Sequence, residues 1–155
     1  MTEIFVDGDA CPVKDEIYAV ASRLGMAVIV VANQRINVPH DLGVEMIVVE
    51  AGPDAADDWI AEEIQPADVV VTADIPLAAR CLEVGALALG TNGREFTLDS
   101  IGGALATREI KAQVRETGVM TGGPPPLTNR DRSRFSNVLD QVVHRAMRSR
   151  STRKN

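Results

Sequence analysis

Aromatic side chains and cysteines are scarce in this sequence. Phe, Trp and Tyr together make up 3% of its 155 residues, so a buried core must be built mostly from Val, Ile, Leu and Ala. The scarcity also argues against a platform of aromatic side chains on which the bases of single-stranded nucleic acid would stack. The two cysteines, Cys11 and Cys81, have neither a CxxC spacing nor a histidine-rich context. A reduced protein is therefore expected.

Long apolar runs and a basic leader are also missing. No apolar run approaches the roughly 20 residues of a membrane span, and the N-terminal Met1-Thr2-Glu3 lacks the basic residues of a signal peptide. With 45% hydrophobic and 25% charged residues, the composition is typical of a globular protein. We expect a cytoplasmic protein without membrane contact, long enough for one domain with a substantial core.

A net positive charge is absent as well. The chain carries a formal net charge of −6, and the residues from Arg145 onward carry only basic charges, so the rest of the chain is more acidic still. Such a body does not attract a polyanion through its overall field. Bound cations and a few local arginines would have to hold a nucleic acid. We expect a domain over residues 1–147 and a basic disordered tail over residues 148–155. The sequence indicates no oligomeric state.

Apolar runs and helical spacings alternate along the chain. The runs that predict strands are Ile4–Val6, Met26–Ala32, Val44–Val49, Asp68–Thr72 and Ala86–Leu89. Helical spacing is found over Pro12–Leu24, Asp54–Ile64, Pro76–Val84, Leu105–Glu116 and Arg132–Met147. A loop is expected over Thr121–Pro126. This alternation predicts a single three-layer α/β domain with a mainly parallel, five-stranded sheet. In the common strand order 3-2-1-4-5, the carboxyl ends of the first and fourth strands are neighbours.

Two aspartates one residue apart follow the first predicted strand. Asp7 and Asp9 come directly after Ile4–Val6, and Pro12 is well placed to begin a helix. In open α/β sheets the ligand crevice lies at the carboxyl ends of the strands. Two close carboxylates repel each other unless a cation or a shared proton relieves them. The alternative is that one aspartate caps the following helix while the other is solvated.

Further aspartates are expected at the same edge. Asp74 ends the fourth predicted strand, where capping of the next helix is the alternative role. Farther upstream, Asp54 is a candidate helix cap, Asp57 borders the apolar face of that helix, and Asp58 points away from it. The resulting set of candidate catalytic and metal-binding carboxylates is Asp7, Asp9, Asp57 and Asp74. Carboxylate oxygens are the ligands that Mg²⁺ and Mn²⁺ prefer, and such ions activate water for phosphoryl displacement.

A few basic and polar residues are candidates for binding a phosphate group. The densest basic patch of the predicted domain surrounds Asp131, which itself has capping-box spacing to Thr128. Arginine side chains in such a patch could hold a phosphate that the acidic site needs help in binding. The candidates are Asn33, Arg94, Arg132 and Arg134. For each arginine the alternative is a solvated surface position. Cys11 is interpreted as a small buried thiol rather than as a nucleophile.

Several of these segments occur together in a known family. They are Asp7–Pro12, Val31–Gln34, Ala51–Asp57, Val71–Ala78, Thr121–Pro124 and Asp131–Phe135. In this order they resemble the YaiI/YqxD family of uncharacterised bacterial proteins, over nearly the whole chain up to Met147. That family is similar to the PIN-like superfamily of metal-dependent nucleases. The resemblance implies the strand order 3-2-1-4-5 and a divalent-metal centre at the four aspartates named above. Gly8 stands where alanine is expected, which should loosen the backbone there without affecting metal ligation.

Three functions are compatible with these residues. The first is a magnesium- or manganese-dependent nuclease acting on RNA or single-stranded nucleic acid, in which Asp57 ligates a second ion or orients the attacking water. The second is a haloacid-dehalogenase-like phosphatase with Asp7 as its nucleophile. Its expected downstream order fails, because the acidic pair Asp57-Asp58 precedes Thr72. The third is a non-catalytic module that binds a nucleotide or a protein partner and keeps a metal for structure. We favour the nuclease.

Overall fold

The computed structural model describes residues 2–39, 43–50, 52, 54–102 and 127–153. The strands are β1 (Glu3–Asp7), β2 (Ala27–Ala32), β3 (Val44–Val48), β4 (Val69–Val71), β5 (Leu87–Leu89) and β6 (Glu95–Phe96). The helices are the 3₁₀ turn η1 (Gly8–Ala10), α1 (Lys14–Leu24), α2 (Ala55–Glu63), α3 (Ile75–Val84) and α5 (Asn129–Arg153). The predicted helix over Leu105–Glu116 and the predicted loop over Thr121–Pro126 lie outside the described residues. Within the described ranges, no helix is both long and apolar enough to cross a bilayer.

One six-stranded sheet runs through the described part of the chain, in the order β3-β2-β1-β4-β5-β6. All neighbours pair in parallel except β5 and β6, which are antiparallel. The predicted α/β class, the mainly parallel sheet and the strand order 3-2-1-4-5 are confirmed. The expected number of five strands is corrected to six. The added strand is only two residues long, too short for apolar alternation to reveal it.

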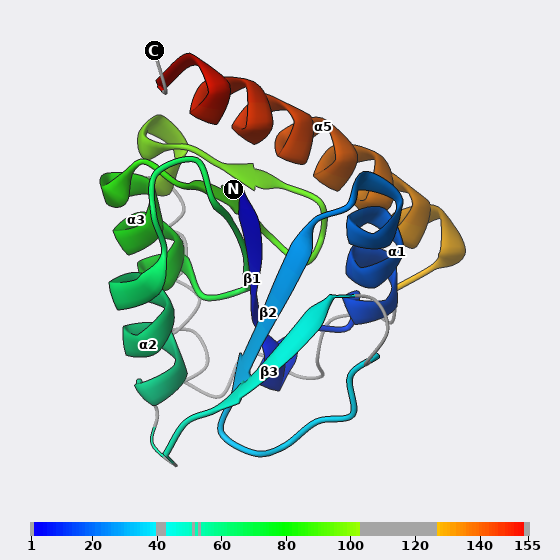
Figure 1. Ribbon diagram of the computed structural model, residues 1–155, viewed down its shortest axis with the longest axis vertical. Helices are drawn as coiled ribbons and strands as arrows, with labels where there is room; N and C mark the ends of the chain where they lie inside the picture. The colour runs from blue at the N-terminus through cyan, green and yellow to red at the C-terminus, as the bar shows by residue number, and fades with distance from the viewer. Residues whose placement is uncertain (1, 40–42, 51, 53, 103–126, 154–155) are drawn as a thin grey trace, which may run out of the picture.

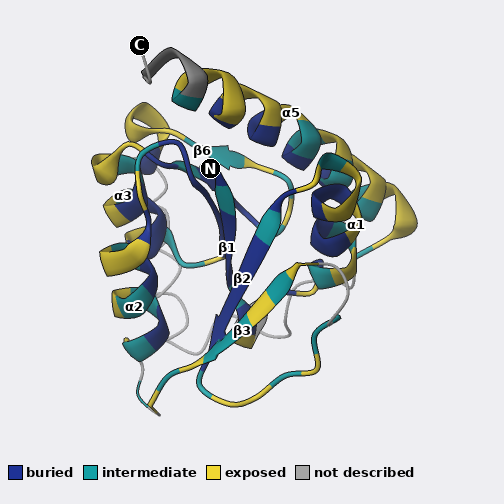
Figure 2. Cartoon of the chain, viewed as in Figure 1, coloured by how far each residue is buried: buried dark blue, intermediate teal, exposed yellow. Residues whose placement is uncertain are grey.

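Helices cover both faces of the sheet and bury its side chains in two clusters (Figures 1 and 2). Alternation along β1 directs Ile4 and Val6 to the face that α1 and α5 cover, whereas Phe5 packs on the side of α2 and α3. The central strands are buried on both faces, as continuous apolar runs require in a parallel sheet. Phe135 of α5 is among the largest fully buried side chains.

The carboxyl-terminal helix extends farther than the sequence indicated. Helix α5 continues to Arg153, so the prediction of a disordered tail beginning at residue 148 is wrong for residues 148–153. The predicted domain boundary at residue 147 also falls inside this helix. The run of basic and small polar residues suggested a solvated segment, but composition cannot show that one of these arginines has a buried partner.

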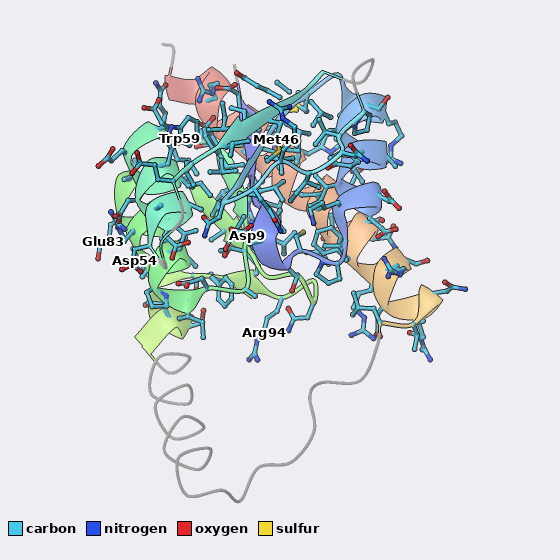
Figure 3. The ribbon with its side chains drawn as sticks, turned by 90° about the horizontal axis from the view of Figure 1, so that it is seen from below. Asp9, Met46, Asp54, Trp59, Glu83 and Arg94 are labelled. Carbon is cyan, nitrogen blue, oxygen red and sulfur yellow. The ribbon has the colours of Figure 1, made fainter. Side chains whose placement is uncertain are left out.

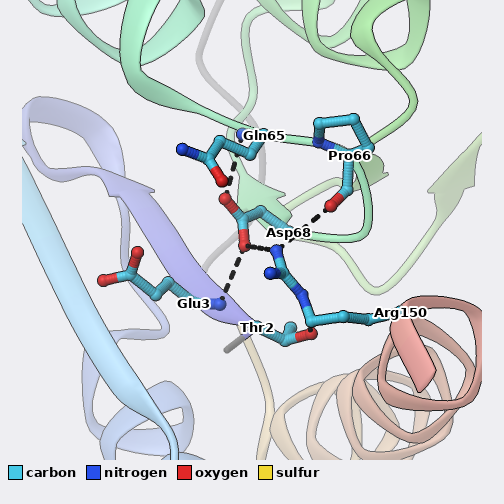
Figure 4. Close-up of polar contacts among 6 residues, drawn as sticks. All are labelled: Thr2, Glu3, Gln65, Pro66, Asp68 and Arg150. Atoms are coloured by element: carbon cyan, nitrogen blue, oxygen red, sulfur yellow. Dashed lines mark hydrogen bonds and ion pairs between the residues drawn. The ribbon is translucent and has the colours of Figure 1, made fainter. Parts of the chain in front are cut away.

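That partner is Asp68, a carboxylate at the amino-terminal edge of the sheet (Figure 4). The Arg150 guanidinium donates to an Asp68 carboxylate oxygen at 3.0 Å and to the Pro66 carbonyl oxygen at 3.1 Å. The Asp68 side chain is 2% exposed and also accepts hydrogen bonds from the backbone N–H groups of Glu3 and Gln65. The end of α5 is thereby tied to the starts of β1 and β4.

Candidate functional site

The carboxyl ends of β1, β2 and β4 lie at one edge of the sheet. The strand register places these ends side by side, because Asp7 pairs with Val31 and Val6 pairs with Val71. Figure 3 looks toward this edge, with Asp9 near the centre and Asp54 at the start of α2.

Thr72 joins two of the predicted site residues. Its hydroxyl donates to Asp7 Oδ2 at 3.1 Å and accepts the backbone N–H of Asp74 at 2.9 Å. Thr72 is 1% exposed, so these contacts replace water. Thr72 was not among the predicted site residues. A buried hydroxyl directly after the apolar run of β4 was the available signal.

Asp74 is the N-cap of α3. Its Oδ1 accepts the backbone N–H of Leu77 at 2.9 Å, so the capping role offered as an alternative is present. Capping occupies one carboxylate oxygen and leaves the other for further contacts. Neither Asp7 nor Asp9 caps a helix with its side chain: η1 begins after Asp7 without a side-chain cap, and the N-cap of α1 is Val13.

Asp57, on the first turn of α2, lies against the same group of carboxylates. Burial raises the pKa of Asp57 to about 7, and the charges of Asp74 and Asp7, a hydrogen bond with Asp74 and the charge of Asp54 act in the same direction. Asp57 and Asp74 therefore form an acid pair that favours one shared proton. The structure brings Asp7, Asp57 and Asp74 together. The strand order led us to expect this of Asp7 and Asp74, and the helical spacing led us to expect it of Asp57.

The surroundings of Asp7 also disfavour its ionised form. Burial raises the pKa of Asp7, the hydrogen bond from Thr72 opposes this rise, and the charges of Asp9 and Asp74 add to it. None of the four aspartates forms an ion pair with a lysine or arginine among the residues that the structure describes. Their mutual repulsion is therefore not relieved by a basic side chain in that part of the chain.

The other two acids of α2 behave differently. Asp58 is exposed and forms a 2.8 Å ion pair with Arg80, which confirms that it points away from the apolar face. Asp54 stands at the N-cap position of α2 but makes no side-chain capping hydrogen bond. Asp54 thus occupies the predicted cap position, but its side chain does not cap the helix.

Asp9 is held by the residue that follows β2. Both of its carboxylate oxygens accept the backbone N–H of Asn33, each at 3.1 Å. The Asn33 side chain turns the other way, and its Nδ2 donates to the carbonyl oxygen of Gly52 at 3.2 Å. A side-chain donor of Asn33, predicted as a phosphate contact, is therefore engaged within the protein.

Gly8 is required for the close approach of η1 to β2. A Cβ atom at this position would lie 2.8 Å from Val30 Cγ1 and 3.2 Å from the Val31 carbonyl oxygen. The expectation that glycine merely loosens the backbone here needs correction, because Gly8 is buried and tightly packed. The missing side chain lets the turn that carries Asp9 lie directly on the end of β2.

The predicted arginines occupy different surroundings. Arg132 uses one guanidinium nitrogen, Nη1, to donate to Glu16 Oε1 at 2.8 Å and to the Pro12 carbonyl oxygen at 2.9 Å. Arg94 is exposed in the turn after β5 (Figure 3) and Arg134 is exposed on α5. Neither of these two guanidinium groups forms an ion pair with a described residue.

Two secondary predictions are confirmed. Thr128 and Asp131 form a reciprocal capping box at 3.0 and 3.1 Å, and the hydrogen bonds from Thr128 lower the pKa of Asp131. Cys11 is a buried thiol whose pKa is raised, chiefly by burial, so a nearby helix terminus does not activate it.

A family model described as "Uncharacterized BCR, YaiI/YqxD family" matches residues 5–145. The chain belongs to the YaiI/YqxD family. It is 57% identical over 148 residues to a UPF0178 protein of Paramagnetospirillum magneticum, with 96% of this chain and 98% of the relative covered. A UPF0178 protein of Caulobacter sp. strain K31 is 54% identical over the same shares. A third, from Rhodopseudomonas palustris, is 51% identical, with 97% and 96% covered. No solved structure matches the chain.

Membership in the YaiI/YqxD family brings no reaction with it, because the names of these relatives state none. The chemistry must be argued from the side chains at the sheet edge. The four aspartates offer hard oxygen donors whose charge no basic side chain relieves in the described ranges, which suits Mg²⁺ or Mn²⁺.

The described acidic residues of this YaiI/YqxD chain do not complete a metal site by themselves. Among the described residues, no group of three His, Cys, Asp or Glu side chains is placed so that it could hold an ion. A cage made of protein ligands alone is therefore not preformed. Mg²⁺ typically binds through one or two carboxylates and keeps several waters, and the acid group at this edge fits that mode of binding.

Proposed function

We propose that this chain is a phosphodiesterase that depends on Mg²⁺ or Mn²⁺ and cleaves RNA or single-stranded nucleic acid. One observation carries the proposal. Asp7, Asp57 and Asp74 meet at the carboxyl edge of a parallel sheet, and no described basic side chain forms an ion pair with them. Partly buried carboxylates repel one another in such a group, and a bound cation relieves that repulsion.

The four aspartates would have two roles, metal ligation and orientation of the attacking water. One or two of Asp7, Asp9 and Asp74 would hold the ion, with waters as its remaining ligands, and Asp57 would ligate a second ion or orient the attacking water. When bound, the metal activates water and stabilises the charge that develops on the phosphoryl group. Thr72 keeps one oxygen of Asp7 in place. The attacking water gives up one proton to solvent as its oxygen forms a bond to phosphorus, the bond to the leaving oxygen breaks, and that oxygen takes up a proton from solvent.

Arginines would bind the phosphate groups of the substrate. Arg94 and Arg134 are exposed and their guanidinium groups form no ion pair within the described ranges, so they are open to phosphate oxygens. Both hydrogen bonds that Arg132 forms with described residues use Nη1, so its other guanidinium nitrogens would bind a phosphate. Three such contacts compensate locally for the acidic character of the whole chain.

The proposal is tested by a degradation assay on structured and unstructured RNA, with Mn²⁺ or with EDTA. We compare the wild type with Asp7→Asn, and we use Asp58→Asn as the matched control because that aspartate is exposed and paired with Arg80. We expect cleavage in Mn²⁺, none in EDTA, a loss of about 100-fold for Asp7→Asn and none for Asp58→Asn.

Three results would point elsewhere. Activity that survives Asp7→Asn undiminished would come from a contaminating nuclease, and the proposal would then be wrong. A wild-type chain whose melting temperature rises with Mn²⁺ but which cleaves nothing would be a non-catalytic metal-binding module. Phosphate trapped covalently on Asp7 would identify a phosphatase instead.

A further inference from the structure

Asn33 connects two parts of the acidic edge that are remote in sequence. Its backbone N–H donates to both oxygens of Asp9 at 3.1 Å, and its side-chain Nδ2 donates to the Gly52 carbonyl oxygen at 3.2 Å. Asp9 belongs to η1, and Gly52 lies three residues before α2, which carries Asp57. One residue at the end of β2 thus touches the segments that present two of the predicted site carboxylates.

The Asp9 half of this connection is fixed by packing. Gly8 sits so close to β2 that a Cβ would lie 3.3 Å from Ala32 Cβ as well as 2.8 Å from Val30 Cγ1. The turn η1 therefore lies directly on the strand that ends beside Asn33. The Asp9 contact also uses a backbone N–H, which a change of the Asn33 side chain does not remove.

The other half depends on the Asn33 side chain alone. Only the amide nitrogen can face the carbonyl oxygen of Gly52, because two acceptor oxygens would repel each other. This orientation leaves Oδ1 buried without a hydrogen-bond partner among the residues that the structure describes. A buried acceptor without a partner lowers stability. The amide nevertheless keeps the orientation that forms the hydrogen bond to Gly52. Unsatisfied polar atoms of this kind are rare in native structures and need an explanation.

We propose that Asn33 is a positioning residue that sets the placement of Asp57 relative to Asp9 by tying the segment before α2 to the end of β2. Asn33 then acts through these carboxylates and does not contact the phosphate of the substrate itself. The inference rests on the proposed metal-dependent function of the same edge. Residues that orient metal ligands are often as important for metal binding as the ligands.

The test compares Asn33→Leu and Asn33→Gln with the wild type. Leucine has the branching of asparagine without a donor, whereas glutamine keeps an amide. Gln34→Ala is the control, because Gln34 is the exposed neighbour of Asn33. Each variant is assayed for RNA cleavage far below its melting temperature, over a range of Mn²⁺ concentrations. Melting with and without Mn²⁺ provides a readout that needs no activity.

For Asn33→Leu we expect kcat to fall by about 10- to 100-fold and the half-saturating Mn²⁺ concentration to rise by about 10-fold. KM for RNA should stay within about twofold, because no substrate contact is lost. Asn33→Gln should recover part of the loss and Gln34→Ala should match the wild type. A Leu variant that melts earlier but keeps the wild-type kcat and Mn²⁺ response would show a purely structural role and overturn the inference.

The two proposals fail in different ways. If the wild type binds Mn²⁺ without cleaving RNA, the proposed function is wrong, while an unchanged Mn²⁺-induced melting shift in Asn33→Leu would overturn the positioning role separately. If the wild type cleaves RNA and Asn33→Leu does so equally well, only the positioning role is wrong. A wild type without any Mn²⁺ response overturns both.

Discussion

Replacement of Asp57 by asparagine should stabilise the metal-free protein at alkaline pH. In the folded chain, burial and the neighbouring carboxylates raise the pKa of Asp57 from an ordinary 3.8 to about 7. Between these two values the folded chain holds a proton that the unfolded chain has released, so stability falls as the pH rises through this window. Above about pH 7 the ionised Asp57 repels Asp7 and Asp74. Asparagine keeps a donor for Asp74 and carries no charge.

The size of the effect follows from the width of this window. A difference of about three pH units at about 1.4 kcal/mol each gives a ceiling of about 4 kcal/mol. Asp57 is only partly buried, and solvent screening reduces the expected gain to about 1–2 kcal/mol at pH 8. For a chain of this length, that gain corresponds to a rise of about 3–6 °C in melting temperature. At pH 5 only about a third of this window has been crossed, so the gain should fall below half of its value at pH 8.

The measurement is urea unfolding at pH 5 and pH 8, in EDTA so that no divalent ion relieves the repulsion. Asp58→Asn removes the same charge from the next residue, but its partner Arg80 is exposed, so we expect a change of less than about 1 kcal/mol at both pH values. An Asp57→Asn variant that is less stable than the wild type at pH 8, or equally stabilised at both pH values, would refute the reasoning.

Two further variants probe the contacts around the sheet. Arg150→Ala leaves the Asp68 carboxylate, 2% exposed, with only backbone donors, and should lower the free energy of unfolding by about 2–3 kcal/mol in urea titrations; an unchanged midpoint would contradict the role of this ion pair. Thr72→Val removes the hydroxyl between Asp7 and Asp74, and should cost about 1–3 kcal/mol and lower Mn²⁺-dependent cleavage by about 10-fold. Cleavage at the wild-type rate would show that Thr72 does not position Asp7.

The architecture was largely readable from the sequence because its strands are buried on both faces. Continuous apolar runs such as Ile4–Val6 mark such strands directly, and glycines mark the helix ends at Gly25 and Gly85. The strand order could not be predicted from such runs, because apolar periodicity says nothing about which strands are neighbours. It came from the common fold and from the family resemblance. The end of α5 was missed because its anchoring ion pair joins residues 82 positions apart.

The acidic residues of the site could be predicted from the sequence, but the hydrogen bonds that hold them in place could not. Parallel strands bring their carboxyl ends to one edge, so Asp7 and Asp74 could be placed together from topology alone. The hydroxyl of Thr72 reaches Asp7 across 65 positions, and the Asn33 amide reaches Gly52 across 19. Such hydrogen bonds depend on side-chain placement in three dimensions, and no spacing in the sequence encodes them.

Aspartates at the two edges of the sheet have different surroundings, and this difference bears on function. Asp68 is almost fully buried, yet an arginine and two backbone N–H groups satisfy its carboxylate. Asp7 and Asp57 are partly buried at the other edge, and burial together with the neighbouring carboxylates raises their pKa values. No described arginine or lysine forms an ion pair with either of them. The chain can thus neutralise a buried carboxylate where stability requires it. Three repelling carboxylates together at the carboxyl edge destabilise the free protein. The cation that we propose would relieve this repulsion, so the Mn²⁺ response of the melting temperature is a direct test of the proposal.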